Sequence, residues 1–205
     1  MRSRSGLASA LLSQSYGLLR NNLEGLTLEE ALASAGGLRS VLGILKHTAG
    51  WSHVYHSYAF DAEPLHWAQT GWPRGLRDTI DPSREYLDEV LLWLDDSWER
   101  WQESLRPLPD EAFDEPHRCH WGTMAPLFDL VVMVANHWAY HAGEINEVLA
   151  ICRREAWEYA EEVEENHIST AGHRIRPAWM TPEQAARYEA YMARRDAELH
   201  GGGQA

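Results

Sequence analysis

Apolar residues recur every three to four positions along four long stretches of the chain, which is the spacing of amphipathic α-helices. The predicted helices run from Leu7 to Leu23, from Leu38 to Phe60, from Asp81 to Leu105 and from Met124 to Arg153. Between the first two, Thr27-Leu28-Glu29-Glu30 has the pattern of a capping box and predicts a short helix to about Ser34. No run alternates in the manner of a β-strand. The pattern predicts an all-α protein, an up-down four-helix bundle.

The ends of the third and fourth helices carry their own signals. Asp81-Pro82 predicts a helix start, with Asp81 as the N-cap and Pro82 in the first helical position. The run Arg106-Pro107-Leu108-Pro109 predicts the end of this helix, because proline cannot continue it. For the fourth helix, Thr123 is the predicted N-cap and Pro126 lies in the first turn.

The chain beyond Arg153 has a different character. Its apolar periodicity is weak and lies among many glutamates, and Thr181-Pro182-Glu183-Gln184 predicts a final helix to about Leu199. A chain of 205 residues fits one domain with a single core. We therefore expect one bundle domain over 1–205, with its core at about 7–153 and a C-terminal extension at 154–199.

Composition and charge exclude several classes of protein. The formal net charge is −13, which repels the phosphate backbone and argues against nucleic-acid binding. No stretch of about eighteen uncharged apolar residues is present to span a membrane, and the N-terminus lacks the apolar segment of a signal peptide. Cys119 and Cys152 do not form a disulfide framework. We expect a reduced, cytoplasmic protein.

Two histidines in the fourth predicted helix point to metal chemistry. His137 and His141 are four residues apart, so their imidazoles lie one turn apart at the edge of the apolar stripe. His47 lies beside the apolar face of the second predicted helix. A buried imidazole without a partner is costly, and one shared divalent ion satisfies all three. The pattern predicts a three-histidine metal site, and three separately satisfied core histidines are the alternative.

Such a site has a recognisable chemistry. Three neutral imidazoles leave one position of a tetrahedral Zn²⁺ ion open, as in catalytic sites, and nickel, iron or manganese fit the same ligands. The ion can activate either a water molecule or a thiol at that position. Glu144, close after His141, is a candidate base or orienting group, or else a surface carboxylate. Asn136 and Tyr140 are further candidates for contact with the imidazoles.

Other polar and aromatic residues are weaker candidates for a functional site. His117-Arg118-Cys119-His120 contains zinc-binding residue types, yet no second ligand pair at a suitable spacing accompanies it. Asp95 and Glu99, the carboxylates considered on the third helix, are expected to face solvent. We expect Trp67 and Trp72 to cover the edge of the core rather than to close over a pocket.

These features resemble the DinB-like superfamily of metal-binding four-helix bundles, which includes mycothiol-dependent maleylpyruvate isomerases and bacillithiol transferases. The resemblance rests on Leu45-Lys46-His47-Thr48-Ala49-Gly50-Trp51, on His137-Trp138-Ala139-Tyr140-His141-Ala142-Gly143-Glu144-Ile145 and on the spacing of the long helices over about 7–153. It implies that His47, His137 and His141 bind a divalent ion. It also implies that the ion activates a low-molecular-weight thiol, which attacks a small-molecule electrophile.

Three functions stay open at this point. They are a metal-dependent enzyme of thiol transfer, a metal-dependent hydrolase that uses bound water, and a non-catalytic stress-response bundle whose ion stabilises the fold. The resemblance favours the first. Because bundles with an added C-terminal helix often pair, we also expect a homodimer.

Overall fold

The computed structural model describes residues 3–34, 39–65 and 80–153, together with four isolated helical positions, 182, 186, 190 and 193. The long helices are α1 (Arg4–Asn21), α3 (Val41–Phe60), α4 (Arg84–Leu105) and α5 (Leu127–Cys152). The short elements are helix α2 (Leu28–Leu32), the 3-10 helix η1 (Asp110–Asp114) and the strands β1 (Pro116–Arg118) and β2 (Met124–Pro126).

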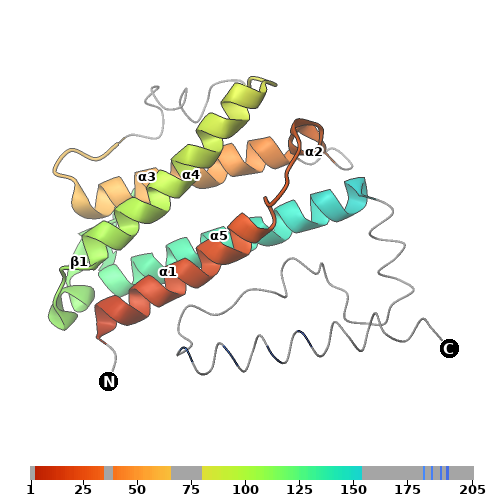
Figure 1. The fold of residues 1–205 in the computed structure, drawn as a ribbon. Helices are drawn as coiled ribbons and strands as arrows, with labels where there is room; N and C mark the ends of the chain where they lie inside the picture. Colours follow the sequence, from red (N-terminus) through yellow and green to blue (C-terminus); the bar gives the residue numbers. More distant parts are fainter. Residues whose placement is uncertain are drawn as a thin grey trace.

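The four long helices lie side by side around one apolar core, so the predicted all-α bundle is confirmed (Figure 1). Their directions do not simply alternate, because α1 and α5 run one way whereas α3 and α4 both run the other way (Figure 1). Buried contacts agree: His53 bonds to Trp93, and His56, further along α3, bonds to Ser104, further along α4. The order of directions is up, down, down, up. Residues 61–83 separate α3 from α4, a length that permits a crossover along the bundle.

Hydroxyl side chains begin several of these helices. Ser3 and Ser40 each accept a hydrogen bond from the backbone N–H three residues ahead, which satisfies one free donor of the first turn. The capping box predicted at Thr27 is confirmed. The Thr27 hydroxyl accepts from the Glu30 N–H, and the Glu30 carboxylate accepts from the Thr27 N–H.

The predicted N-cap of the third long helix is wrong. Ser83, not Asp81, caps α4, and its hydroxyl accepts a hydrogen bond from the Tyr86 N–H. Asp81 and Pro82 therefore precede the helix. Serine and aspartate are similarly good caps, so the sequence alone could not choose between two candidates this close together.

A two-stranded antiparallel hairpin precedes α5, so the expectation that the chain contains no strand is wrong. β1 pairs with β2 in the register Pro116↔Pro126, His117↔Ala125 and Arg118↔Met124. Three-residue strands are too short to produce an alternating pattern that sequence analysis can detect. Because β2 continues to Pro126, α5 begins at Leu127. Thr123, the predicted N-cap, lies in the hairpin turn, where its carbonyl accepts the Cys119 N–H.

The core is held together where α3, α4 and α5 meet at Ser52. The buried Ser52 hydroxyl accepts a hydrogen bond from Trp138 Nε1 at 2.5 Å and donates to the Thr48 carbonyl at 2.8 Å. The Ser52 carbonyl accepts from Trp101 Nε1 at 3.3 Å. Trp101 and Trp138 are both fully buried, so one serine satisfies two indole N–H groups in the core.

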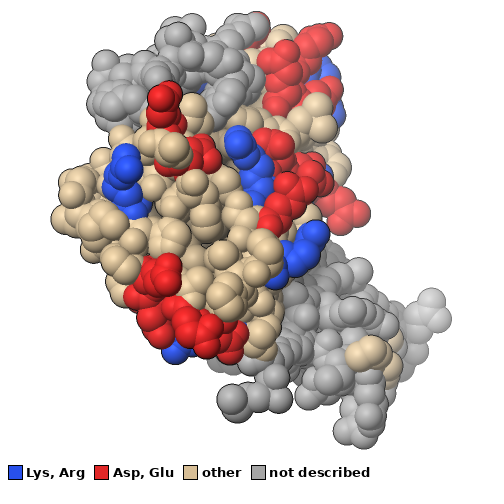
Figure 2. Space-filling model, turned by 90° about the vertical axis from the view of Figure 1, so that its left-hand side faces the viewer, with Lys and Arg blue, Asp and Glu red and all other residues tan. Residues whose placement is uncertain are grey.

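The hairpin occupies one end of the bundle. In the view onto this end, acidic and basic side chains lie around a central area of uncharged side chains (Figure 2). Trp121, in the hairpin turn, and Met124, in β2, are 52% and 59% exposed. The end of the molecule that carries the hairpin therefore presents apolar groups to solvent.

Part of the sequence-based prediction concerns residues outside the described ranges. The four described positions of the predicted final helix are helical and exposed. The rest of the C-terminal extension, and Trp67 and Trp72, lie outside the described residues. Of the helices that the structure describes, none combines the length and apolar character that crossing a membrane requires.

Replacing Ser52 with alanine removes the partner of the buried Trp138 indole. We expect Ser52→Ala to lower the free energy of unfolding by about 1–3 kcal/mol, the range for a buried donor left unsatisfied. Ser97→Ala is the matched control, because the buried Ser97 hydroxyl bonds to the Leu94 carbonyl of its own helix, and such bonds add little stability. Urea unfolding followed by circular dichroism measures both variants. Equal losses would contradict the role given to Ser52.

Candidate metal centre

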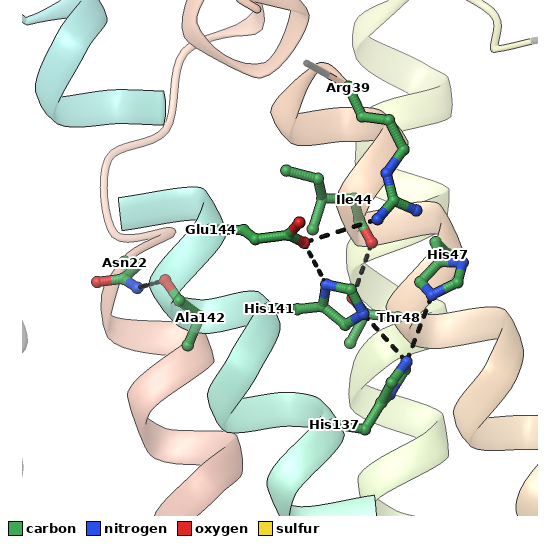
Figure 3. Close-up of polar contacts among 9 residues, drawn as sticks. All are labelled: Asn22, Arg39, Ile44, His47, Thr48, His137, His141, Ala142 and Glu144. Carbon is green, nitrogen blue, oxygen red and sulfur yellow. Dashed lines mark hydrogen bonds and ion pairs between the residues drawn. The ribbon is translucent and has the colours of Figure 1, made fainter. Parts of the chain in front are cut away.

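The packing of α3 against α5, which run in opposite directions, brings three imidazoles together (Figure 3). His137 Nε2 lies 3.4 Å from His47 Nε2 and 3.1 Å from His141 Nε2. One coordinating atom from each ring lies within 4.8 Å of the other two. His47 belongs to the second turn of α3, and the other two rings are one turn apart on α5. The structure thus groups the three histidines that the sequence pattern singled out.

These separations suit a single divalent ion. Nitrogens about 2.0–2.1 Å from a tetrahedral zinc ion lie roughly 3.3–3.4 Å from one another. The two N···N distances of 3.1 and 3.4 Å are close to that value. Among the His, Cys, Asp and Glu residues that the structure describes, this is the only group of three placed to hold an ion. The residues therefore fit the metal that the sequence pattern predicts.

Glu144 fixes the orientation of one imidazole. Its Oε2 atom accepts a hydrogen bond from His141 Nδ1 at 2.5 Å (Figure 3). A hydrogen on Nδ1 leaves a lone pair on His141 Nε2, the atom that faces His137. Arg39 Nη2 lies 3.7 Å from the same carboxylate oxygen, so a positive charge stands next to Glu144. The carboxylate therefore selects the tautomer of His141 that can bind a metal.

Burial keeps the three imidazoles neutral. Desolvation is the main cause that lowers the pKa of His47 to about 4 and that of His137 to about 3, and the charges of His141 and Arg39 lower both further. Burial also lowers the pKa of His141, against the opposing effect of Glu144. The rings are thus unprotonated at neutral pH, which is the state in which imidazole binds a metal.

Asn136 and Tyr140, the two further residues considered for contact with the imidazoles, form no hydrogen bond to them in the described part of the structure, and Tyr140 makes only a ring contact. Its ring packs edge-on against His141 with centroids 5.1 Å apart. Asn136 and Tyr140 are both exposed. These two residues are close to the histidines in the sequence, but they lie on the solvent side of α5.

The two carboxylates considered on α4 have different environments. Glu99 is exposed, as predicted. Asp95 is only partly exposed, so the prediction that it faces solvent is wrong in part. It accepts a hydrogen bond from the Tyr16 hydroxyl and forms an ion pair with Arg20 at 3.2 Å. Asp95 therefore links α4 to α1 and does not take part in the metal centre.

One partner of the site, Arg39, was not apparent from the sequence. Arg39 precedes α3 and contacts Glu144 only through the tertiary fold. His53 and His56 lie on the same helix as His47, yet they are buried against α4, where desolvation lowers the pKa of each to about 4. Helical spacing separates them from His47, because at about 100° per residue His53 lies about 120° and His56 about 180° around α3 from it.

The fold and the cluster together define a class of protein, an all-α bundle whose second and last long helices carry a candidate three-histidine metal centre. The family model described as the DinB superfamily matches residues 11–145, a span that contains all three histidines. The chain belongs to the DinB superfamily. Among curated proteins, none matches the sequence.

The metal-free protein is expected to lose stability as the pH falls below neutrality. An unfolded chain protonates its histidines near the ordinary pKa of 6.5, whereas folded His47 and His137 resist protonation down to about 4 and 3. Between these values the unfolded state binds more protons, so the free energy of unfolding decreases from pH 6.5 towards pH 4 and is insensitive to these groups above pH 6.5.

Urea unfolding in the presence of a chelator, repeated across this pH range, measures the effect. His137→Gln removes one of the buried imidazoles and should flatten the dependence in part, since His53 and His56 still contribute. If the free energy of unfolding of His137→Gln fell with pH as steeply as that of the wild type, His137 would not be held neutral by burial.

Proposed function

We propose that the chain binds one divalent ion through His47, His137 and His141, with zinc as the first candidate, and uses it to activate a low-molecular-weight thiol that attacks a small-molecule electrophile. The observation that carries the proposal is the convergence of three neutral imidazoles with N···N distances of 3.1 and 3.4 Å. Three protein ligands leave one position free for a reactant, which distinguishes catalytic from structural zinc sites. Nickel, iron and manganese accept the same ligands.

When bound, the ion supplies Lewis acidity, which lowers the pKa of a thiol placed at the free position. The protein presents the three lone pairs and keeps them unprotonated by burial. In the reaction the thiol gives up its proton to solvent, and its sulfur forms a bond to the electrophilic carbon. The leaving group departs from that carbon with its electron pair.

Glu144, the predicted catalytic residue, acts in this proposal as a positioning residue. Its Oε2 atom accepts the His141 N–H at 2.5 Å and lies 3.7 Å from Arg39, so it works through the imidazole that it orients. Carboxylates that hold a metal-binding histidine in this way raise the basicity of the ring and fix its direction.

Metal content is the first expected outcome. Untagged wild-type protein is expected to hold about one divalent ion per chain, and His47→Ala and His141→Ala to lose it while their helicity survives. His117→Ala, which changes a histidine outside the cluster, is the matched control and should retain the metal. Elemental analysis and circular dichroism measure both properties. A wild type that binds no ion even after reconstitution would overturn the three-histidine centre.

The same titrations test Glu144. Glu144→Gln keeps the size of the side chain but weakens the hydrogen bond to His141, so zinc affinity is expected to fall about 10- to 100-fold. Isothermal titration calorimetry measures this affinity. An affinity equal to that of the wild type would remove the positioning role without affecting the assignment of the three ligands.

Thiol dependence separates the candidate reactions. The metal-loaded protein is expected to release chloride from an activated aryl chloride only when a thiol is present, and the activity should disappear in His137→Ala. Chloride release and consumption of the thiol are measured together. Ester hydrolysis without thiol would favour a hydrolase that uses water. No turnover of either probe, combined with a large fall in melting temperature after chelation, would favour a non-catalytic bundle stabilised by its ion.

A further inference from the structure

Arg39 brings a positive charge to the edge of the histidine cluster. Its side chain extends from the residue before the N-cap of α3 towards Glu144, and Arg39 Nη2 lies 3.7 Å from Glu144 Oε2 (Figure 3). The same carboxylate oxygen accepts the His141 N–H at 2.5 Å. Only one carboxylate therefore separates the guanidinium from an imidazole of the cluster, and a small molecule held at the cluster is within reach of Arg39.

The contact with Glu144 occupies little of the Arg39 guanidinium. A separation of 3.7 Å is an ion pair and is too long for a hydrogen bond. Arginine carries five N–H donors, and none of those of Arg39 forms a hydrogen bond within the described ranges of the chain. The side chain is 49% exposed. Its donors are therefore open to a ligand that arrives from solvent.

The charge of Arg39 acts on the whole cluster. Burial is the main cause that lowers the pKa of His47, His137 and His141, and the Arg39 charge lowers the pKa of each ring further. Among the lysines and arginines that the structure describes, no other one contributes to all three shifts. The protein as a whole has a formal net charge of −13. Arg39 thus supplies a local attraction for anions in an acidic molecule.

The backbone next to Arg39 is held in place at the start of α3. The Val41 N–H donates to the Ala33 carbonyl at 3.3 Å, which ties this end of the helix to the segment after α2. The Ser40 hydroxyl accepts a hydrogen bond from the Gly43 N–H at 3.1 Å. The position from which the Arg39 side chain extends is therefore fixed by the same helix that carries a histidine of the cluster.

We propose that Arg39 binds a carboxylate group of a reactant, carried by the thiol or by the electrophile, while the rest of that reactant lies at the three-histidine centre. The reaction itself rests on the proposed function, whereas binding of the carboxylate to Arg39 can be measured without turnover.

Shape and charge both support a carboxylate as the ligand. The planar guanidinium is always charged, and its parallel N–H groups match the two oxygens of a carboxylate. The charges of Glu144 and Arg39 cancel, so a divalent ion on three neutral imidazoles leaves the loaded site with two positive charges. A thiolate balances one of these charges. A carboxylate on either reactant balances the other, and Arg39 is the group that offers it hydrogen bonds.

Two pairs of probes differ within each pair by one negative charge. Mercaptopropionate and its methyl ester represent the thiol, and a chloronitrobenzoate and the corresponding chloronitrobenzamide represent the electrophile. Each probe is titrated alone into the zinc-loaded full chain by isothermal titration calorimetry. In one of the two pairs the carboxylate should bind about three- to tenfold more tightly than its neutral partner, as for a hydrogen-bonded ion pair at a half-exposed site. That pair identifies the reactant that carries the carboxylate.

Three variants assign the preference to Arg39. Arg39→Gln removes the charge and should abolish the preference for the carboxylate. Arg39→Lys keeps the charge without the planar donor group and should retain a smaller preference. Arg106→Gln is the matched control and should behave as the wild type. It removes the same charge from an exposed position directly after α4, at the opposite end of the bundle (Figure 1). Circular dichroism and zinc content verify that each variant is folded and loaded.

A purely structural contact between Arg39 and Glu144 gives a different result. Arg39→Gln would then change the affinity for zinc and leave the ratio between the charged and neutral probes as in the wild type. That result would overturn the proposal, and so would a zinc-loaded wild type that shows no preference in either pair. In both cases the metal centre would stand.

Failure of the proposed function can be recognised separately. A protein that holds no zinc would overturn that function, and the electrophile pair, titrated in the presence of a chelator, would then decide the role of Arg39 alone. A carboxylate preference that disappears in Arg39→Gln would retain the anion site without the metal. The absence of any preference would overturn the anion site as well.

Discussion

The hydrogen bond from the Trp138 indole to the Ser52 hydroxyl fixes how α3 lies against α5, and the candidate metal centre depends on that alignment. Trp138 follows His137 directly, and His47 lies little more than one turn before Ser52. Because helices are rigid, fixing one contact fixes the neighbouring ones. A slip of one turn, about 5.4 Å, would move the imidazoles beyond the reach of a shared ion. The contact that packs α3 against α5 in the core therefore also places the three imidazoles next to one another.

The surroundings of the cluster differ on its two sides. Glu144 and Arg39 lie on one side and supply a carboxylate and a positive charge. Trp51 and Tyr55 lie on the other side and continue towards the hairpin and His120. The cluster therefore has charged groups at one end and aromatic rings at the other. The surroundings make the two sides of the cluster chemically different, which three imidazoles alone would not do.

Local sequence signals predicted the bundle well wherever the controlling interactions are local. The periodicity of apolar residues located the four long helices, and the Thr27 capping box was confirmed because it involves groups three residues apart. The same signals placed the start of α4 at Asp81 instead of Ser83 and missed the hairpin around Thr123, where competing caps and very short strands leave no distinct pattern. They also carried no information on the shared direction of α3 and α4, because periodicity identifies the buried face of a helix and not the way the helix points.

The sequence by itself determined that His137 and His141 share one face of a helix, since a spacing of four residues has that result in any α-helix. Only the tertiary structure decided that α5 packs against the face of α3 that carries His47, and not against the faces that carry His53 and His56. The reason is the range of the forces involved. Helix geometry acts over a few residues, whereas the meeting of His47 with His137, 90 positions apart, depends on how whole helices pack and in which direction they run.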